Sequence, residues 1–250
     1  MRKAIIIISV LMALGCTAIA LFAQNDTSNI EDSRLQELEH LAEQGDTAAL
    51  HSLILYLDDR AVDYVEVVEV YDPETEEFLD ADSINQENQE NAENTAFYKE
   101  RLDYWLDKGL AINDPVAVFV KGIRLYYTDE DEAIKYLSMA ADLGNAQAAL
   151  FCGSAAMNQG KGDEAFIYLT KAYELGAPSA GWHLAMCYSA GIGTNPNREK
   201  AIEVMRHAAM LDYPEAVSEM RRIEPDNKLW QQKADSIGID FADFPIITNE

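Results

Sequence analysis

The sequence predicts an all-α protein, an α-solenoid of helical hairpin repeats interrupted by a small inserted β-hairpin or irregular loop. A pattern of helix end, tight joint and helix start occurs four times, as GLAINDPVA, AADLGNAQA, AYELGAPSA and AAMLDYPEA. One alanine keeps its place in all four, at intervals of 31, 32 and 36 residues: Ala117, Ala148, Ala180 and Ala216. Periods of roughly 20 to 50 residues are typical of stacked helical units that bury their apolar faces on one another.

The first 23 residues have the features of an export signal. Arg2 and Lys3 precede an apolar run, Ala4–Phe22, and the small residue Ala23 stands before a polar stretch. This order predicts a signal peptide at residues 1–23, cleaved after Ala23, and a location in the periplasm or cell envelope. Two alternatives stay open. The run is close to the roughly 20 residues that span a bilayer, so it could remain as an anchor. The stretch ALGC resembles a bacterial lipobox, in which Cys16 would carry the lipid.

The solenoid is expected to span residues 33–223, after a flexible N-terminus at residues 24–32. Its first helix is predicted at about residues 33–44, because Ser33 and Gln36 have capping-box spacing. Ala49 occupies the joint position 68 residues before Ala117, which leaves room for one unit plus an insertion at residues 59–94.

The insertion has two parts of different character. The first, VDYVEVVEVYDPETEEFLD, alternates β-branched and acidic residues around the turn-forming DPET and predicts a short hairpin. The second, ADSINQENQENAEN, is polar and poor in apolar residues, so we expect it to be mobile. The hairpin is either a decoration of the helical stack or a contact element.

Each later repeat contains two predicted helices, A and B. Helix A of the last full repeat runs from Pro178 to about Ser189, and residues 180, 184, 185 and 188 place small and apolar side chains on one face. Proline opens helix A at Pro115, Pro178 and Pro214, where its missing N–H costs nothing. Glycines end these helices, because glycine adopts the left-handed cap without strain; they are Gly191 and Gly193 after helix A, and Gly144 and Gly176 after helix B, with Asn113 in the same role.

Helix B is predicted to start at a polar cap in each repeat. Asn197, Asp163 and the pair Thr128 with Asp131 are the expected capping residues. After the last repeat, a helix at about residues 214–222 begins a further unit that is not completed. Residues 224–250 are expected to form a C-terminal cap, in which residues 228–237 cover the open core, and a tail.

The net charge of the chain limits the kinds of partner that it can bind. The chain has 44 Asp and Glu against 19 Lys and Arg, a net charge of −25. Such a surface repels nucleic acid and anionic membrane surfaces. It either suits a basic protein or peptide or only keeps an exported protein soluble.

No pattern of catalytic or metal-binding residues is found in the sequence. The four histidines, His40, His51, His183 and His207, have no zinc-type spacing, and no HExxH, GxSxG or phosphate-loop motif occurs. We therefore expect no catalytic residue, no metal and no small-molecule cofactor. Cys152 and Cys187 are expected to be buried free thiols, although export would permit a bridge between them.

The segment AGWHLAMCYSAGIGTNPNREKAIEVMRHAA, residues 180–209, resembles a Sel1-like repeat. The matching positions are Ala180, Leu184, Tyr188, Gly191, Gly193, Lys200, Ala201, Ala208 and Ala209. Three positions depart mildly from the pattern, Ala185, Thr194 and Asn197, and the earlier repeats match less well. The resemblance covers about 150 residues. It implies a right-handed, tetratricopeptide-like superhelix that binds proteins or peptides without catalysis.

In such superhelices the A helices line the concave side. The resemblance therefore implies partner-binding side chains at exposed A-helix positions, which here are Arg124, Tyr127, Phe151, His183 and Met186. The expected function is a non-catalytic interaction scaffold or adaptor in the bacterial cell envelope. One alternative is a membrane-anchored protein with the same role. Another alternative is a hydrolase of cell-wall-type compounds, because cysteine-rich relatives of this family are described as binding or degrading such compounds. Those relatives have two cysteines in each repeat, whereas Cys152 and Cys187 each stand alone, which counts against the alternative.

Overall fold

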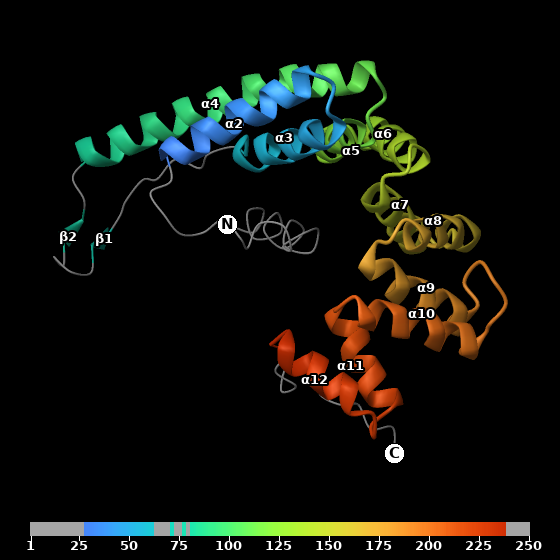
Figure 1. Ribbon diagram of the computed structural model, residues 1–250. Helices are drawn as coiled ribbons and strands as arrows, with labels where there is room; N and C mark the ends of the chain where they lie inside the picture. Colours follow the sequence, from blue (N-terminus) through green and yellow to red (C-terminus); the bar gives the residue numbers. More distant parts are fainter. Residues whose placement is uncertain (1–27, 63–70, 73–76, 79–80, 239–250) are drawn as a thin grey trace. The chain divides into compact units, whose positions relative to one another are not determined.

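The structure is a computed structural model that describes residues 28–62, 71–72, 77–78 and 81–238 (Figure 1). Helices make up nearly all of the described chain, which confirms an all-α repeat solenoid. The chain divides into two compact units, residues 1–120 and residues 121–250, each of which is described by itself. Helix α5 (Pro115–Leu125) crosses the division.

The first unit is built on α2 (Ser28–Glu43), α3 (Thr47–Arg60) and α4 (Ala81–Ala111). Helix α3 packs against both α2 and α4. Leu53, Ile54 and Leu57 of α3 are fully buried, together with Leu102 of α4, and Trp105 is 3% exposed. A single apolar face of α3 therefore holds the unit together, because removing such side chains from water is the main favourable term in folding.

The predicted hairpin is present, but the second half of the insertion is not a mobile segment. Strand β1 (Tyr71–Asp72) pairs antiparallel with β2 (Glu77–Phe78), with Tyr71 opposite Phe78. The polar run that follows instead forms the first half of α4, which is 31 residues long. Glutamate, glutamine and alanine are good helix formers, and the packed second half of α4 supplies the nucleus on which they extend.

The start of the first helix also differs from the prediction. Helix α2 begins at Ser28, so residues 28–32 are helical and Ser33 lies inside the helix and is not its cap. Residues 24–27 and the predicted signal peptide lie outside the described residues. Among the described residues, no helix is both long and apolar enough to cross a membrane.

The described part of the second unit, residues 121–238, contains the end of α5 and seven further helices. They are α6 (Glu130–Asp142), α7 (Ala146–Asn158), α8 (Gly162–Glu174), α9 (Pro178–Ala190), α10 (Arg198–Met210), α11 (Pro214–Ile223) and α12 (Lys228–Ser236). From α6 onward each helix packs against the next. The alanines that the repeat pattern places at the contacts are buried: Ala133, Ala165, Ala201, Ala140, Ala172 and Ala208.

The helix boundaries confirm most predicted caps and correct two. Asn197 accepts a hydrogen bond from the Lys200 N–H at 3.0 Å, as predicted. At α6 the cap is Asp129, which accepts from the Glu132 N–H, whereas the Thr128 hydroxyl donates to a carbonyl of the preceding helix. Helix α8 begins at Gly162, two residues earlier than expected, so Asp163 lies in its first turn and is not its cap. Asp is preferred over Thr at a helix N-cap, and its carboxylate oxygen accepts from the N–H of the third helical residue, as Asp129 does from Glu132.

The left-handed joints and the C-terminal cap are as predicted. Gly144, Gly176 and Asn113 have φ of 93°, 84° and 54° after their helices. Helix α12 packs on α11 and buries Trp230, which is 1% exposed, at the end of the stack.

Candidate functional site

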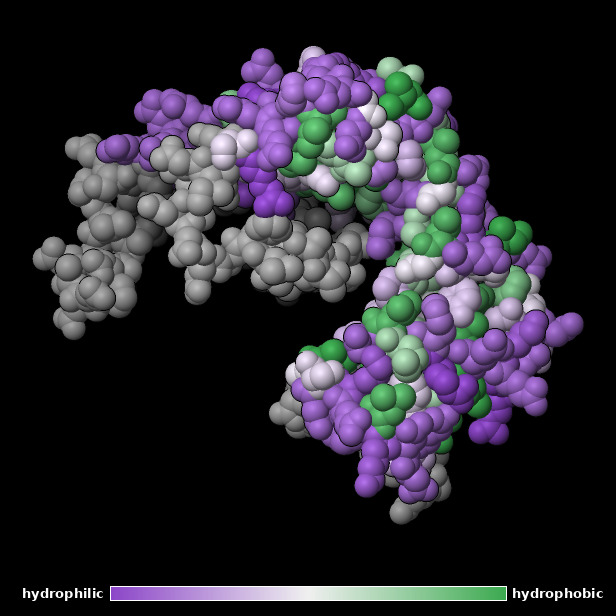
Figure 2. Space-filling view, viewed as in Figure 1, coloured by the Kyte–Doolittle hydropathy of each residue, from purple (hydrophilic) through white to green (hydrophobic). Residues whose placement is uncertain are grey.

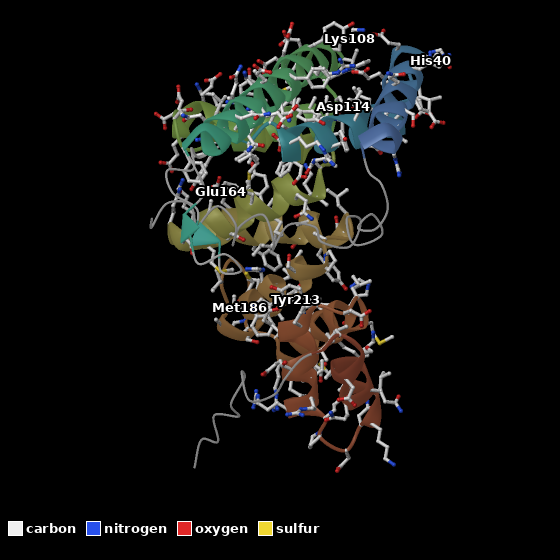
Figure 3. All side chains as sticks on the ribbon, turned by 90° about the vertical axis from the view of Figure 1, so that its left-hand side faces the viewer. His40, Lys108, Asp114, Glu164, Met186 and Tyr213 are labelled. Atoms are coloured by element: carbon white, nitrogen blue, oxygen red, sulfur yellow. The ribbon has the colours of Figure 1, made fainter. Side chains whose placement is uncertain are left out.

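The five side chains predicted to bind a partner all lie in the second unit. Arg124 is in the last turn of α5, Tyr127 follows that helix, Phe151 lies on α7, and His183 and Met186 lie on α9. Tyr127 is 67% exposed and Met186 is 36% exposed. Figure 3 places Met186 on α9.

The structure joins two of these residues through a third aromatic ring. The Tyr126 ring lies edge-on to Tyr127, with ring centres 5.4 Å apart, and edge-on to Phe151, with centres 5.0 Å apart. Edge-to-face pairs at such distances stabilise the arrangement beyond their buried area. We call Tyr126, Tyr127 and Phe151 the aromatic row. The prediction missed Tyr126, although its position next to Tyr127 on a short joint was the available signal.

His183 and Met186 form a separate part of the surface. The His183 Nδ1 atom lies 2.9 Å from the Ser179 carbonyl oxygen, one helical turn away, which fixes the half-buried ring against α9. Helix α9 contacts α7, which carries Phe151. Within the described chain, no ring contact or hydrogen bond connects His183 or Met186 to the aromatic row.

A second surface, in the first unit, was not predicted. Helices α2 and α4 border a groove of about 500 Å³, which we call the α2–α4 groove. It is lined by Glu39, His40 and Glu43 of α2 and by Phe97, Glu100, Arg101, Tyr104 and Trp105 of α4. Figure 3 shows His40 and Lys108 at the same end of the two helices.

Two cations hold the walls of this groove together. The guanidinium of Arg101 donates to both carboxylate oxygens of Glu39. The Lys108 ammonium donates to Glu43 Oε1 at 2.6 Å, and the Tyr104 hydroxyl donates to the same oxygen at 2.9 Å. Lys108 and Tyr104 together lower the pKa of Glu43, because both hydrogen bonds favour its charged form.

Both cations also lie over aromatic rings of α4. The Arg101 guanidinium is 4.8 Å from the centre of the Phe97 ring. The Lys108 ammonium is 4.6 Å from the Tyr104 ring and 4.9 Å from the Trp105 ring. A positive charge is attracted to the face of such a ring. The groove therefore combines carboxylates with aromatic faces, a set of groups that suits cationic side chains.

The sequence prediction missed this groove because its two walls come from segments more than 60 residues apart in the chain. The Arg101–Glu39 and Lys108–Glu43 contacts that join these walls do not follow from the repeat pattern. Signals were present in the spacing. Phe97 and Tyr104 are seven residues apart, and so are Arg101 and Lys108, so each pair shares one face of α4.

The remaining polar clusters have structural explanations. A cavity of about 150 Å³ borders α10 and α11, and the Arg222 guanidinium that lines it is paired with Glu219. His51 Nε2 lies 2.7 Å from Asp114 Oδ2, while Asp114 Oδ1 accepts the N–H groups of Val116 and Ala117 and so caps α5. Buried Asp114 is thus fully hydrogen-bonded.

The described residues contain no group of three or more His, Cys, Asp or Glu side chains placed to hold a metal ion. Cys152 and Cys187 are both buried free thiols. Burial raises the pKa of both thiols, so they are poor nucleophiles near neutral pH.

Comparisons with known proteins find that part of the chain is similar to a repeat family. A family model described as Sel1 repeat matches residues 120–145, 149–176 and 178–213. A solved Sel1 repeat protein from Oxalobacter formigenes is 28% identical, with a TM-score of 0.44, over 47% of this chain and 95% of that one.

A second solved structure is similar in fold. It is a protective antigen present in uropathogenic Escherichia coli strains, displaying an SLR fold, with 18% identity and a TM-score of 0.51. The match covers 76% of this chain but only 36% of that one. No curated protein matches the chain.

Proposed function

We propose that this chain, in which a Sel1 repeat model matches residues 120–145, 149–176 and 178–213, is a non-catalytic protein-binding scaffold or adaptor of the bacterial cell envelope. Sel1 repeats generally mediate interactions between proteins. The observation that carries the proposal is the aromatic row, because Tyr127 is an exposed ring, 67% accessible, on a helical stack with no metal cluster among its described residues. Exposed aromatic anchors of this kind dominate the binding energy of protein interfaces.

A capture experiment with matched variants tests the binding role. The tagged full chain is crosslinked in cell envelopes and its partners are identified, alongside the variants Tyr127→Ala and Ile167→Ala. Ile167 is a suitable control because it is 66% exposed in the same unit but lies on α8, a B helix. We expect a discrete partner that is retained by Ile167→Ala and weakened about tenfold by Tyr127→Ala. Equal retention by both variants would remove the aromatic row from the interface, and the lack of any captured protein would contradict the scaffold role.

A separate measurement tests the proposed envelope location. It distinguishes a cleaved signal peptide, a lipidated N-terminus and a retained membrane anchor. Mass spectrometry of the purified protein gives the mature N-terminus. A chain that begins at Gln24 supports a cleaved signal peptide. A lipid on Cys16 or a retained residue 4–22 segment supports one of the anchored forms with the same binding role. A full-length chain found only in the cytoplasm would overturn the envelope proposal.

A further inference from the structure

The α2–α4 groove lies outside the matched repeats, and its chemistry points to a second kind of contact. Phe97 remains 45% exposed and Tyr104 50% exposed with Arg101 and Lys108 in place over their rings. Exposed apolar surface that gathers in a groove rimmed by polar residues is typical of an interaction site. The groove therefore has ring surface left for a ligand.

The negative charge of the first unit indicates that the groove binds a positively charged partner. Residues 1–120 contain 25 Asp and Glu against seven Lys and Arg, whereas residues 121–250 contain 19 against 12. Hydrophilic residues predominate over α2 and the N-terminal half of α4 (Figure 2). Within the groove, Glu100 is exposed, and among the described side chains it has no ion pair or hydrogen bond. An acidic surface with an open carboxylate attracts a positively charged partner and repels a second copy of this acidic chain.

The groove itself shows how such a partner would be held. Arg101 meets a carboxylate of α2 and the ring of Phe97 at once, and Lys108 meets Glu43 and the ring of Tyr104 at once. Each cation thus contacts one carboxylate and at least one aromatic ring. A cationic side chain from another protein, placed between Glu100 and the open parts of the same rings, would make the same two kinds of interaction.

We infer that the α2–α4 groove binds a basic peptide segment of a partner protein, with two arginines three positions apart in an extended conformation. The spacing follows from α4. Phe97 and Tyr104 are seven residues apart, or about 10.5 Å along the helix axis. In the polyproline II form of an extended chain, three residues span about 9 Å and bring the side chain back to the same face. An Arg-x-x-Arg segment therefore places one guanidinium at each ring, with Glu100 between them. This inference is independent of the aromatic row, which lies in the other unit.

The test measures the binding of defined peptides to the purified full chain. A fluorescent twelve-residue peptide with a central Arg-Ala-Leu-Arg is titrated by anisotropy, together with a matched peptide in which both arginines are glutamines. We expect the arginine peptide to bind at least tenfold more tightly, and more weakly as salt is added. Equal binding of the two peptides would overturn the inference.

Variants distinguish the groove from general attraction to an acidic protein. Glu100→Gln and Phe97→Ala are expected to weaken binding at least fivefold, and neither removes the Arg101 or Lys108 ion pairs. Their controls are Asp107→Asn, an exposed carboxylate of α4 outside the groove lining, and Leu55→Ala, a 49% exposed side chain of α3. Both controls should bind within twofold of the unchanged protein.

Two outcomes would assign the groove otherwise. If Asp107→Asn weakens binding as much as Glu100→Gln, the attraction is unspecific and the inference fails. If sedimentation shows a dimer that Phe97→Ala dissociates, the occupant is a second copy and not a basic peptide. The capture experiment with Tyr127→Ala is unaffected by either outcome, so failure here and failure of the proposed function can be told apart.

Discussion

At the scale of single residues, the packing of the second unit depends on small residues in the A helices. They leave room for a leucine of the following B helix to pack against the A-helix backbone. A Cβ atom added to Gly153 would lie 2.7 Å from Leu169 Cγ and 3.1 Å from the Leu169 backbone nitrogen. Gly122 meets Leu137 in the equivalent way, at 2.9 Å. Ala185 holds this position in the next repeat, where the facing side chain is Met205, a flexible side chain that adapts to the extra methyl group.

This contact gives a prediction for Gly153→Ala. Alanine would raise helix propensity by up to about 1 kcal/mol, but the clash with a buried leucine and its backbone costs more. We expect a net loss of about 1–2 kcal/mol in the free energy of unfolding, measured by urea denaturation. Asn158→Ala, at an exposed position of the same helix, should change it by less than about 0.5 kcal/mol. A stabilised Gly153→Ala protein would show that the two helices do not approach as described.

A second residue-scale prediction concerns Glu224, which joins the C-terminal cap to the stack. Its carboxylate accepts hydrogen bonds from Arg206, Asn227 and the Trp230 indole, and these lower its pKa to about 2. Because this lies below the ordinary value of 4.5, the charged form stabilises the fold fully above about pH 4.5. The stabilisation is lost as the pH falls from 4.5 toward 2.

We therefore expect Glu224→Gln to lose about 1–2 kcal/mol of unfolding free energy at pH 7, a value reduced because the carboxylate is partly exposed. The difference from the unchanged protein should shrink as the pH is lowered below 4.5. Urea unfolding followed by tryptophan fluorescence at pH 7, 4.5 and 3 measures it. Glu199→Gln, at an exposed position, is the control. A difference that is constant with pH would contradict the role given to this carboxylate.

At the scale of elements, the sequence predicted correctly those features, such as helix ends, that depend on a few neighbouring residues. Asn113, Gly144 and Gly176 end their helices as expected, because a left-handed joint requires such residues. We expected the polar first half of α4 to be mobile, and this prediction was wrong. Its composition does not show that the packed second half of the same helix extends it toward the N-terminus. The α2–α4 groove was missed for another reason, because its walls are segments more than 60 residues apart and no local pattern shows that they meet. The five predicted binding residues stay a prediction, now with Tyr126 added between two of them.

At the scale of the whole molecule, the two units differ in what they offer a partner. The first unit carries most of the negative charge and the α2–α4 groove, and the second carries the matched repeats and the aromatic row. The sequence predicted the repeat architecture because four joints share one register, and it predicted the acidic character from composition. It did not predict how that charge is divided, because the boundary between the units lies within α5.

The central claim is that the A helices of the second unit bind another protein, and one measurement tests it most directly. A photo-crosslinking amino acid is placed either at position 186, on α9, or at position 167, on α8, in the otherwise unchanged chain, and envelopes are irradiated. Both positions are exposed, Met186 by 36% and Ile167 by 66%, so reactivity alone favours position 167. We predict a discrete crosslinked protein from position 186 and none from position 167. A partner captured only from position 167 would place the interface on the B helices and contradict this account.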